Sequence, residues 1–244
     1  MKTRLLVIEN KDNHQKDAKK CLETQFKDVV ADFATTYKDA LQMLKKSTYD
    51  GVLSDVFLPN MGEKKDIDHV VSCLKDGEGF VGRKFTLKIY EDLFKNELPY
   101  GILIGSYALN KNLPIVLITD TYHHGKKTEP VNGWSKSKQV PMVDRDVNEE
   151  SCKEEGLDYR NDNEKAQQHE FSKKDWTKGF FNILWMITGK KIVDISAKGI
   201  QTKIPFGWYS SFLNCMKKKD WSSYSSQQEE RESFIKTAKL YLKH

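Results

Sequence analysis

The sequence predicts an α/β fold built on a parallel sheet, and three observations support this. Short apolar runs that end in a polar residue or a turn former are typical of buried parallel strands. The clearest is Tyr49 to Met61, YDGVLSDVFLPNM, in which apolar residues surround Asp55 and Pro59 ends the strand. Amphipathic stretches alternate with such runs, which indicates helical crossover connections. The polar residues that end the strands should therefore meet at one edge of the sheet.

The elements of the first half follow from apolar spacing, taken in chain order. The predicted strands are Leu5–Ile8 ending at Glu9 and Asn10, Val29–Ala31, Val52–Asp55, and Ile115–Ile118 ending at Thr119 and Asp120. The predicted helices are Lys11–Phe26 and Lys38–Lys46. Asp12 and His14 stand in the first turn of the first helix, where a solvated position is commoner than a role at the strand edge.

Two stretches resemble the receiver domain of two-component response regulators. They are ADFATTYKDALQMLKKSTYDGVLSDVFLPNM and PYGILIGSYALNKNLPIVLITD. The resemblance implies a flavodoxin-like, doubly wound, parallel five-stranded sheet. It implies that Asp55 is the phosphoacceptor, and that Glu9 and Asn10 occupy the acidic metal pair. It further implies that Phe57 lends a backbone carbonyl to Mg²⁺ and that the Thr119 hydroxyl follows the phosphoryl group.

Two positions depart from the family pattern. The family has a lysine at the end of its fifth strand, which here falls at Gln139–Val143, and no lysine ends that strand. Either Lys138 or Lys136 serves from an unusual position, or the switch is incomplete. The amide of Asn10 can ligate Mg²⁺ but carries no charge, so Glu9 and Asp55 would have to hold the ion.

The domain organisation expected is a receiver-like domain over residues 1–190 and a helical C-terminal extension over 191–244. The domain carries a helical insertion at about 62–98, interpreted equally well as a lid or docking element beside Asp55 and as a decorative surface hairpin. Residues 144–170 are polar and acid-rich, which predicts a long exposed loop.

A last helix of the domain is predicted over Lys173–Thr188. Ser172 and Asp175 form a start that resembles a capping box, and Gly189 ends the helix. Its apolar face is wide enough to need a second cover beside the sheet: the insertion, the tail or a second subunit. A homodimer therefore stays open. Glu229–Leu242 is predicted to be a closing amphipathic helix.

Composition excludes several classes of protein. The chain has 244 residues, with 40 Lys and Arg against 35 Asp and Glu, and the charges are interspersed, so no nucleic-acid surface is indicated. No apolar run reaches the length of a membrane span, and Met1 leads directly into the first strand, which leaves no room for a signal peptide. The four cysteines are scattered, as in reduced cytoplasmic proteins, and His123 and His124 lack the spacing of a metal site.

The function predicted is phosphorylation-dependent signalling. Asp55 would take a phosphoryl group, with Mg²⁺ bound nearby, from a histidine kinase, another phosphodonor protein or a small phosphodonor, and a downstream protein would recognise the changed surface. The rival prediction is a pseudo-receiver, a protein-interaction module that works without phosphorylation. A third is a hydrolase that uses Asp55. Whether the chain is an enzyme stays open at this point.

Overall fold

The computed structural model describes residues 2–60, 63–82, 90, 93–94, 96–122, 125–145, 147–159, 161 and 163–197, with the side chains of the last helix described to Thr188. A five-stranded sheet in the order β2-β1-β3-β6-β7 forms the centre, and all its strand pairs are parallel. Its strands are β1 (Thr3–Ile8), β2 (Val29–Ala34), β3 (Gly51–Asp55), β6 (Ile115–Ile118) and β7 (Met142–Val143).

This strand order is the flavodoxin-like order, in which the second strand lies outside the first and the chain then crosses to the other side. The predicted fold class is therefore confirmed. The predicted strand Ile115–Ile118 has the observed bounds. The last strand is shorter than the predicted Gln139–Val143, because Gln139 adopts a left-handed conformation (φ 59°) that ends the preceding helix.

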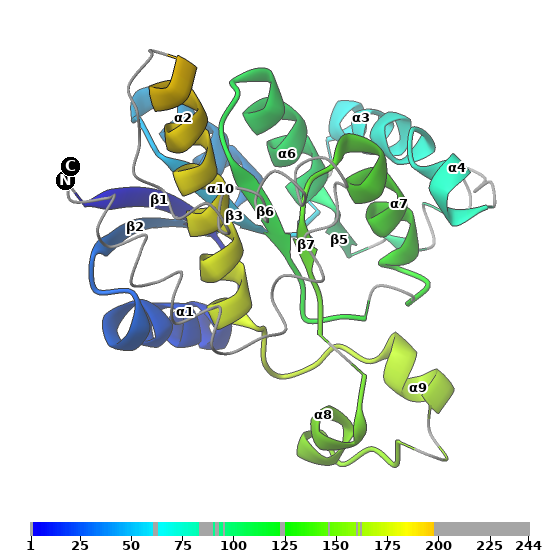
Figure 1. Cartoon of the computed structure of the whole chain (residues 1–244). Coiled ribbons are helices and arrows are strands. Elements are labelled where there is room, and N and C mark those ends of the chain that lie inside the picture. Colours follow the sequence, from blue (N-terminus) through cyan, green and yellow to red (C-terminus); the bar gives the residue numbers. More distant parts are fainter. Residues whose placement is uncertain are drawn as a thin grey trace.

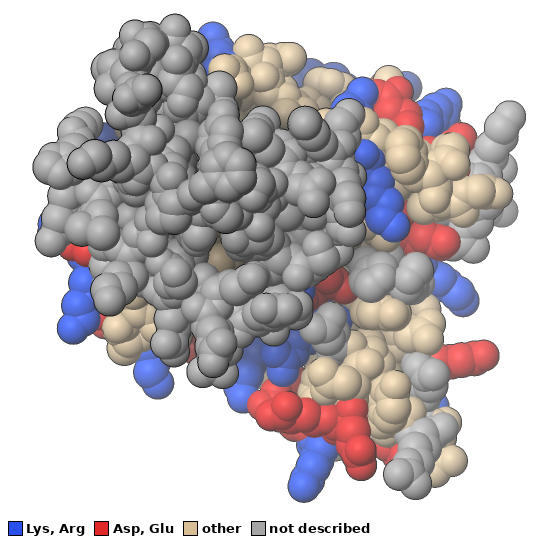
Figure 2. All heavy atoms as spheres, in the orientation of Figure 1, with Lys and Arg blue, Asp and Glu red and all other residues tan. Residues whose placement is uncertain are grey.

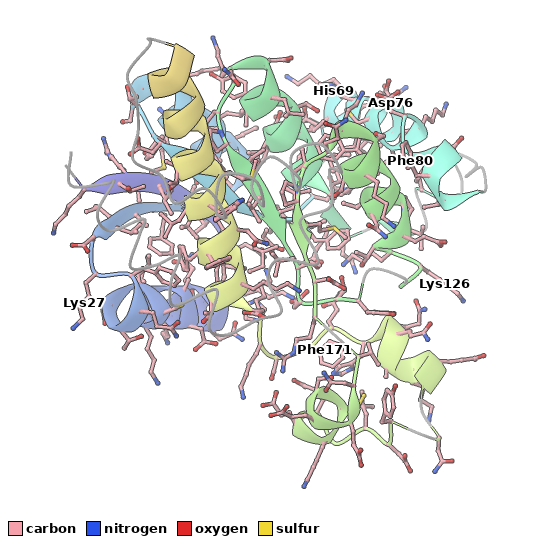
Figure 3. The ribbon with its side chains drawn as sticks, viewed as in Figure 1. Lys27, His69, Asp76, Phe80, Lys126 and Phe171 are labelled. Carbon is pink, nitrogen blue, oxygen red and sulfur yellow. The ribbon has the colours of Figure 1, made fainter. Side chains whose placement is uncertain are left out.

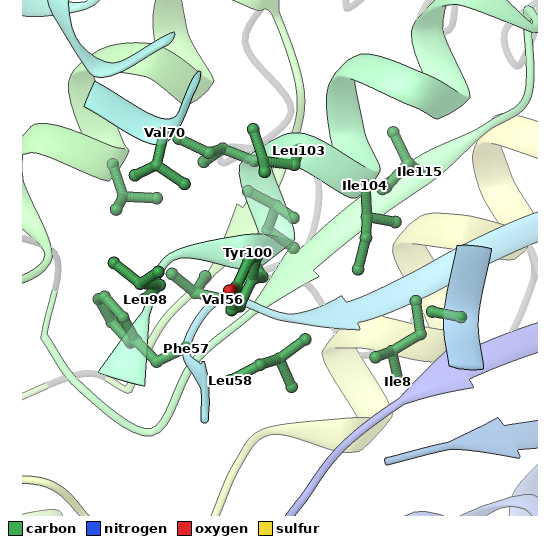
Figure 4. Close-up of a cluster of buried hydrophobic side chains, with 14 of the residues drawn as sticks. Ile8, Val56, Phe57, Leu58, Val70, Leu98, Tyr100, Leu103, Ile104 and Ile115 are labelled. Atoms are coloured by element: carbon green, nitrogen blue, oxygen red, sulfur yellow. The ribbon is translucent and has the colours of Figure 1, made fainter. Parts of the chain in front are cut away.

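Helices cover both faces of the sheet (Figure 1). On one face α1 (Asp12–Gln25) and α10 (Trp176–Ala197) enclose an apolar cluster with the inner strands. On the other face lie α2 (Tyr37–Lys46), α6 (Tyr100–Asn110) and α7 (Glu129–Lys138), of which α7 was not predicted. Figure 4 shows this second cluster, in which Val56, Phe57 and Tyr100 meet beside the end of β3.

The first insertion, predicted at about 62–98, begins and ends near Asp55. Its neck is a short antiparallel ladder between β4 (Leu58–Pro59) and β5 (Glu97–Leu98). Beyond the neck, α3 (Lys64–Lys75) and α4 (Glu78–Val81) pack on α6 and α7. Val70 and Leu74 are fully buried in the shared core. The described part of the insertion is thus a packed layer of the domain and not a decorative surface hairpin.

The second insertion is also structured, so the prediction of a long exposed loop over 144–170 was wrong. It contains α8 (Glu149–Glu154) and α9 (Asn163–Gln168), which extend beyond the sheet in Figure 1. Asn148 and Ser151 form a reciprocal capping box that starts α8. Cys152 and Ala166 are fully buried, so this acid-rich segment is packed and not fully solvated. We call residues 144–168 the α8–α9 lobe.

The last helix begins later and ends later than predicted. The side chain of Asp175 accepts a hydrogen bond from the Lys178 backbone N–H (2.8 Å), so Asp175 alone caps the helix and α10 starts at Trp176. Gly189 lies inside α10 and does not end it. Lys173 and Lys174, predicted to be helical, precede the helix. The predicted helix Glu229–Leu242 lies outside the described residues.

No helix in the described ranges combines the length and hydropathy of a membrane span. Lys and Arg side chains alternate with Asp and Glu side chains over the described surface seen in Figure 2, which agrees with the interspersed charges of the sequence.

Gly77 in the insertion and Gly133 in α7 allow the close contact between these two segments, and this generates a stability prediction. A Cβ atom on Gly77 would lie 2.2 Å from the Trp134 backbone nitrogen. Gly77→Ala should therefore lower the free energy of unfolding by about 1–3 kcal/mol, the usual cost of overpacking. Gly79→Ala is the matched control, because nothing lies within 4 Å of its added Cβ. Urea denaturation measures both, and equal stability of the two variants would contradict the packed insertion.

Candidate functional site

The carboxyl ends of the three central strands meet at one edge of the sheet, as predicted. Ile8 of β1 is paired with Ser54 of β3, and Asp55 is paired with Ile118 of β6. Glu9, Asp55 and Thr119 therefore end neighbouring strands. Their exposed fractions are 0%, 2% and 0%, so a buried polar site lies where the resemblance expects a phosphoacceptor edge.

Lys174 provides the positive charge at this edge. Its ammonium lies 2.8 Å from Asp55 Oδ2 and 2.5 Å from Glu9 Oε2, and its side chain is fully buried. The residue belongs to the extended stretch before α10, which lies outside the helix because Asp175 is the cap. One lysine thus bridges the carboxylates that end β1 and β3.

The structure does not place Lys138 beside Asp55, contrary to the predicted position. Lys138 lies in the last turn of α7, and its ammonium pairs with Asp76 Oδ2 at 2.8 Å. Figure 3 labels Asp76 near α3 and α4, far from Phe171, which precedes Lys174 by three residues. The physical reason is that β7 is reached through a left-handed turn, so α7 and its lysines pack toward the insertion.

Three further polar groups, Asp120, Lys11 and His14, lie around the Lys174 pair. Asp120 directly follows Thr119 and is 4% exposed. Its Oδ2 forms an ion pair with the Lys11 ammonium at 2.7 Å. His14 lies buried in α1 and donates from Nε2 to the Ser172 carbonyl oxygen (3.1 Å). Its Nδ1 then lies 3.7 Å from Glu9 Oε2 and 3.9 Å from Asp120 Oδ2. The expectation that His14 is solvated was wrong, because α1 turns it into this edge.

The charges of this cluster explain the directions of the pKa shifts. Burial raises the pKa of Asp55 well above its ordinary range, and the nearby carboxylates of Glu9 and Asp120 add to the rise against the opposing pull of Lys174. Burial works to lower the pKa of Lys174, but the carboxylates of Asp55, Glu9 and Asp120 outweigh it and the pKa is raised. Burial thus has opposite effects on the two groups, while the neighbouring carboxylates raise the pKa of both.

The two outer acids behave differently from Asp55. For Glu9, contacts with His14 and Lys174 outweigh the effect of burial and hold its pKa below the ordinary value. For Asp120, Lys174 and Lys11 likewise outweigh burial and lower the pKa. Glu9 and Asp120 are therefore the firmly ionised members of the cluster, and Asp55 is the carboxylate whose charge costs most to maintain.

The Thr119 hydroxyl lies in a chain of three threonines. It lies 2.8 Å from the Thr121 hydroxyl, which in turn lies 2.6 Å from the Thr128 hydroxyl. Thr128 is the N-cap residue of α7, but its side chain makes no capping bond to that helix. Any rotation of Thr119 would break the first of these bonds and disturb the residue from which α7 begins.

The residues expected to hold Mg²⁺ offer oxygen atoms, the ligand type that this ion prefers. Asn10 Oδ1 is buried and has no hydrogen-bond partner among the residues that the structure describes, so it is an available acceptor next to Glu9. Glu9 and Asp55 each use one oxygen atom for Lys174. Phe57 is 3% exposed and is the second residue after the end of β3. Among the described residues no three acidic, His or Cys side chains form a metal cluster, so any ion here would depend on the Asn10 amide and a backbone carbonyl.

Sequence reasoning missed Lys174, Lys11 and the burial of His14. Lys174 lies 31 positions after Val143, the end of β7. Because a long acid-rich segment separates the two, the sequence did not indicate that Lys174 takes the place of the lysine expected after β7. Its one signal was its position directly before the last amphipathic helix. His123 and His124, expected not to bind metal, lie outside the described residues.

Comparisons with known proteins give one likeness. No family model matches the chain, and no curated protein matches it. A solved structure of the signal receiver domain of an HD domain-containing protein from Pseudomonas fluorescens Pf-5 is similar with a TM-score of 0.35 and 11% identity. The match covers 70% of this chain and 98% of that chain. The fold assignment therefore rests on the strand order and register of this chain.

Removal of the buried Lys174 ammonium should destabilise the folded protein. Lys174→Met leaves Glu9 and Asp55 without their shared cation, so the free energy of unfolding should fall by about 3–5 kcal/mol. Lys138→Met is the matched control and should change stability by less than about 1 kcal/mol, because its pair with Asp76 is partly exposed. Urea denaturation of both variants measures this. Equal losses would show that Lys174 does not compensate buried charge.

Proposed function

We propose that this chain is a response-regulator-like signalling protein in which Asp55 accepts a phosphoryl group. The single observation that carries the proposal is the bridge from Lys174 to Asp55 and Glu9 at the carboxyl edge of the sheet. The sequence resemblance calls for a lysine beside the phosphoacceptor, and Lys174 meets that requirement from an unexpected place in the chain. With Thr119 on the neighbouring strand end, the acceptor, the acid, the hydroxyl and the cation are all present.

Each side chain then has a chemical task. An oxygen of the Asp55 carboxylate attacks phosphorus as the bond to the donor breaks, and the new phosphoaspartate carries about two negative charges. Lys174 remains within reach to offset that charge. Thr119 leaves Thr121 and bonds to a phosphoryl oxygen. This last movement alters the start of α7, and with it the surface that a downstream protein recognises.

Mg²⁺ belongs to the proposal through Glu9, Asn10, Asp55 and the Phe57 carbonyl. When bound, the ion supplies neutralisation of charge on the transferring group. The free Oδ1 of Asn10 supports this assignment, because a buried oxygen without a hydrogen-bond partner is costly unless something binds it.

A specific observation favours the pseudo-receiver as the second candidate. The side chains of Asp55 and Lys174 are 3% and 0% exposed, so the acceptor is paired and covered. A module that never becomes phosphorylated would retain such a pair for stability alone. The acceptor test below separates the two candidates. A third candidate, the hydrolase that uses Asp55, has no support from the described site.

Acetyl phosphate with Mg²⁺ should add one phosphoryl group to the wild-type chain, visible as a mass increase of the intact protein. Asp55→Asn should add none, and Asp76→Asn is the matched control that should be labelled like wild type, because Asp76 lies at the insertion and pairs with Lys138. No adduct on wild type, under conditions that label an ordinary receiver domain, would reject the switch in favour of the pseudo-receiver.

The metal assignment has its own test. Calorimetric titration with Mg²⁺ should show binding by wild type and none by Asp55→Asn, since that variant loses half of the carboxylate charge expected at the ion. Asn10→Asp should bind more tightly than wild type, because a third carboxylate joins the ligands. Equal affinities for all three proteins would place the ion elsewhere.

A further inference from the structure

The segment that delivers Lys174 crosses the carboxyl edge of the sheet. We call residues 169–175 the strap. Its residue Glu170 forms an antiparallel bridge with Thr121, and the Phe171 backbone N–H donates to the Asp120 carbonyl oxygen (2.9 Å). Phe171 is 2% exposed, and Figure 3 shows it between the lower edge of the sheet and the α8–α9 lobe. The strap thus binds the strand ends on its way from the lobe to α10.

Glu170 fixes the strap through two lysines. Its carboxylate lies 3.1 Å from Lys127 and 3.5 Å from Lys11, and these two residues come from different loops of the same edge. Burial works to raise the pKa of Glu170, but Lys127 and Lys11 outweigh it and hold the pKa below the ordinary value. Glu170 is therefore ionised at neutral pH and joins the strap to both loops.

The strap has few regular hydrogen bonds. The described neighbours of Asp55 in β1, β6 and the start of α6 are instead fixed by the sheet ladder and by helical packing. The strap has one isolated bridge, a few hydrogen bonds and side-chain contacts, some of them to the lobe through Glu155 and Ser172. Local opening proceeds through the segment with the least regular bonding.

We infer that the strap is a gate that covers Asp55 and carries its counter-charge on the same segment. Because Lys174 is part of the strap, opening removes the cover and the ammonium from Asp55 together. A lysine placed at a strand end would stay beside the acceptor when a covering loop moved. In this chain, access to Asp55 and neutralisation of its charge therefore depend on each other. Glu170 is the side chain that determines how often the strap opens, because its ion pairs favour the closed strap. The consequence for phosphorylation rests on the proposed function, but the gate itself does not.

The test replaces the strap's carboxylate with a positive charge. Glu170→Lys should repel Lys11 and Lys127, so the amide of Phe171 should exchange with deuterium several-fold faster than in wild type. Glu170→Gln removes only the attraction, so its exchange should be slower than that of Glu170→Lys. It should be about two- to fivefold faster than that of wild type, as expected for the loss of one exposed ion pair. Acylation of Lys174 by a water-soluble amine reagent, mapped by mass spectrometry, should rise in the same proportion. Glu164→Lys is the matched control, since it makes the same charge change on an exposed position of α9.

The outcomes separate cleanly. Faster Phe171 exchange without faster Lys174 acylation would overturn the inference, and so would equal behaviour of Glu170→Lys and Glu164→Lys. The Leu53 amide in β3 reports global unfolding and should keep the wild-type rate if opening is local. If Phe171 and Lys174 respond but no variant is phosphorylated, the proposed function fails and the gate stands. If wild type and Glu170→Lys are phosphorylated at equal rates despite faster strap exchange, the gate is overturned.

Discussion

The buried ammonium of Lys174 is the constraint on which the rest of this site depends. Three carboxylates, from Glu9, Asp55 and Asp120, lie at one edge of the sheet with almost no exposure to water. An isolated buried carboxylate is strongly unfavourable, so such a group persists only with a cation and hydrogen bonds around it. Lys174 contacts two of the three, and Lys11 pairs with the third. The position of the strap, the start of α10 and the burial of Asp55 all follow from the need to bring that lysine inside.

The sequence was enough to predict the sheet and the polar edge at which Glu9, Asp55 and Thr119 meet, for a physical reason. Apolar runs such as Leu5–Ile8 and Ile115–Ile118 are buried on both faces, so their pattern alone indicates central parallel strands. The polar residues that follow them must then share an edge, which places Glu9 and Asp55 together without any knowledge of side-chain contacts. Strand ends are predictable in this way because the backbone geometry of a parallel sheet fixes them.

The cation could not be predicted in the same way. Spacing along the chain suggested Lys138, but 30 residues, including α8 and α9, separate β7 from Lys174. Pattern reasoning treated that polar segment as a solvated loop, because its apolar residues, such as Cys152 and Phe171, are too few to show periodicity. It also extended the last helix back to Lys173, since Ser172 resembled a cap. The true cap is Asp175, and Ser172 instead donates to Glu155 on the lobe.

Lys127 connects the neck of the first insertion with the strap that follows the second insertion, at the edge of the sheet that holds Asp55. The ammonium of Lys127 lies 2.7 Å from Glu97 in the neck of the first insertion and 3.1 Å from Glu170 in the strap that follows the second. The same ammonium lies 4.4 Å from the centre of the Phe57 ring, two residues beyond Asp55. Lys127 directly precedes Thr128, the last member of the threonine chain that begins at Thr119. A change at Asp55 that reached Thr128 would therefore also reach the neighbouring residue that pairs with Glu97 and Glu170. Through Lys127, the neck of the first insertion and the strap after the second both contact the residues around Asp55.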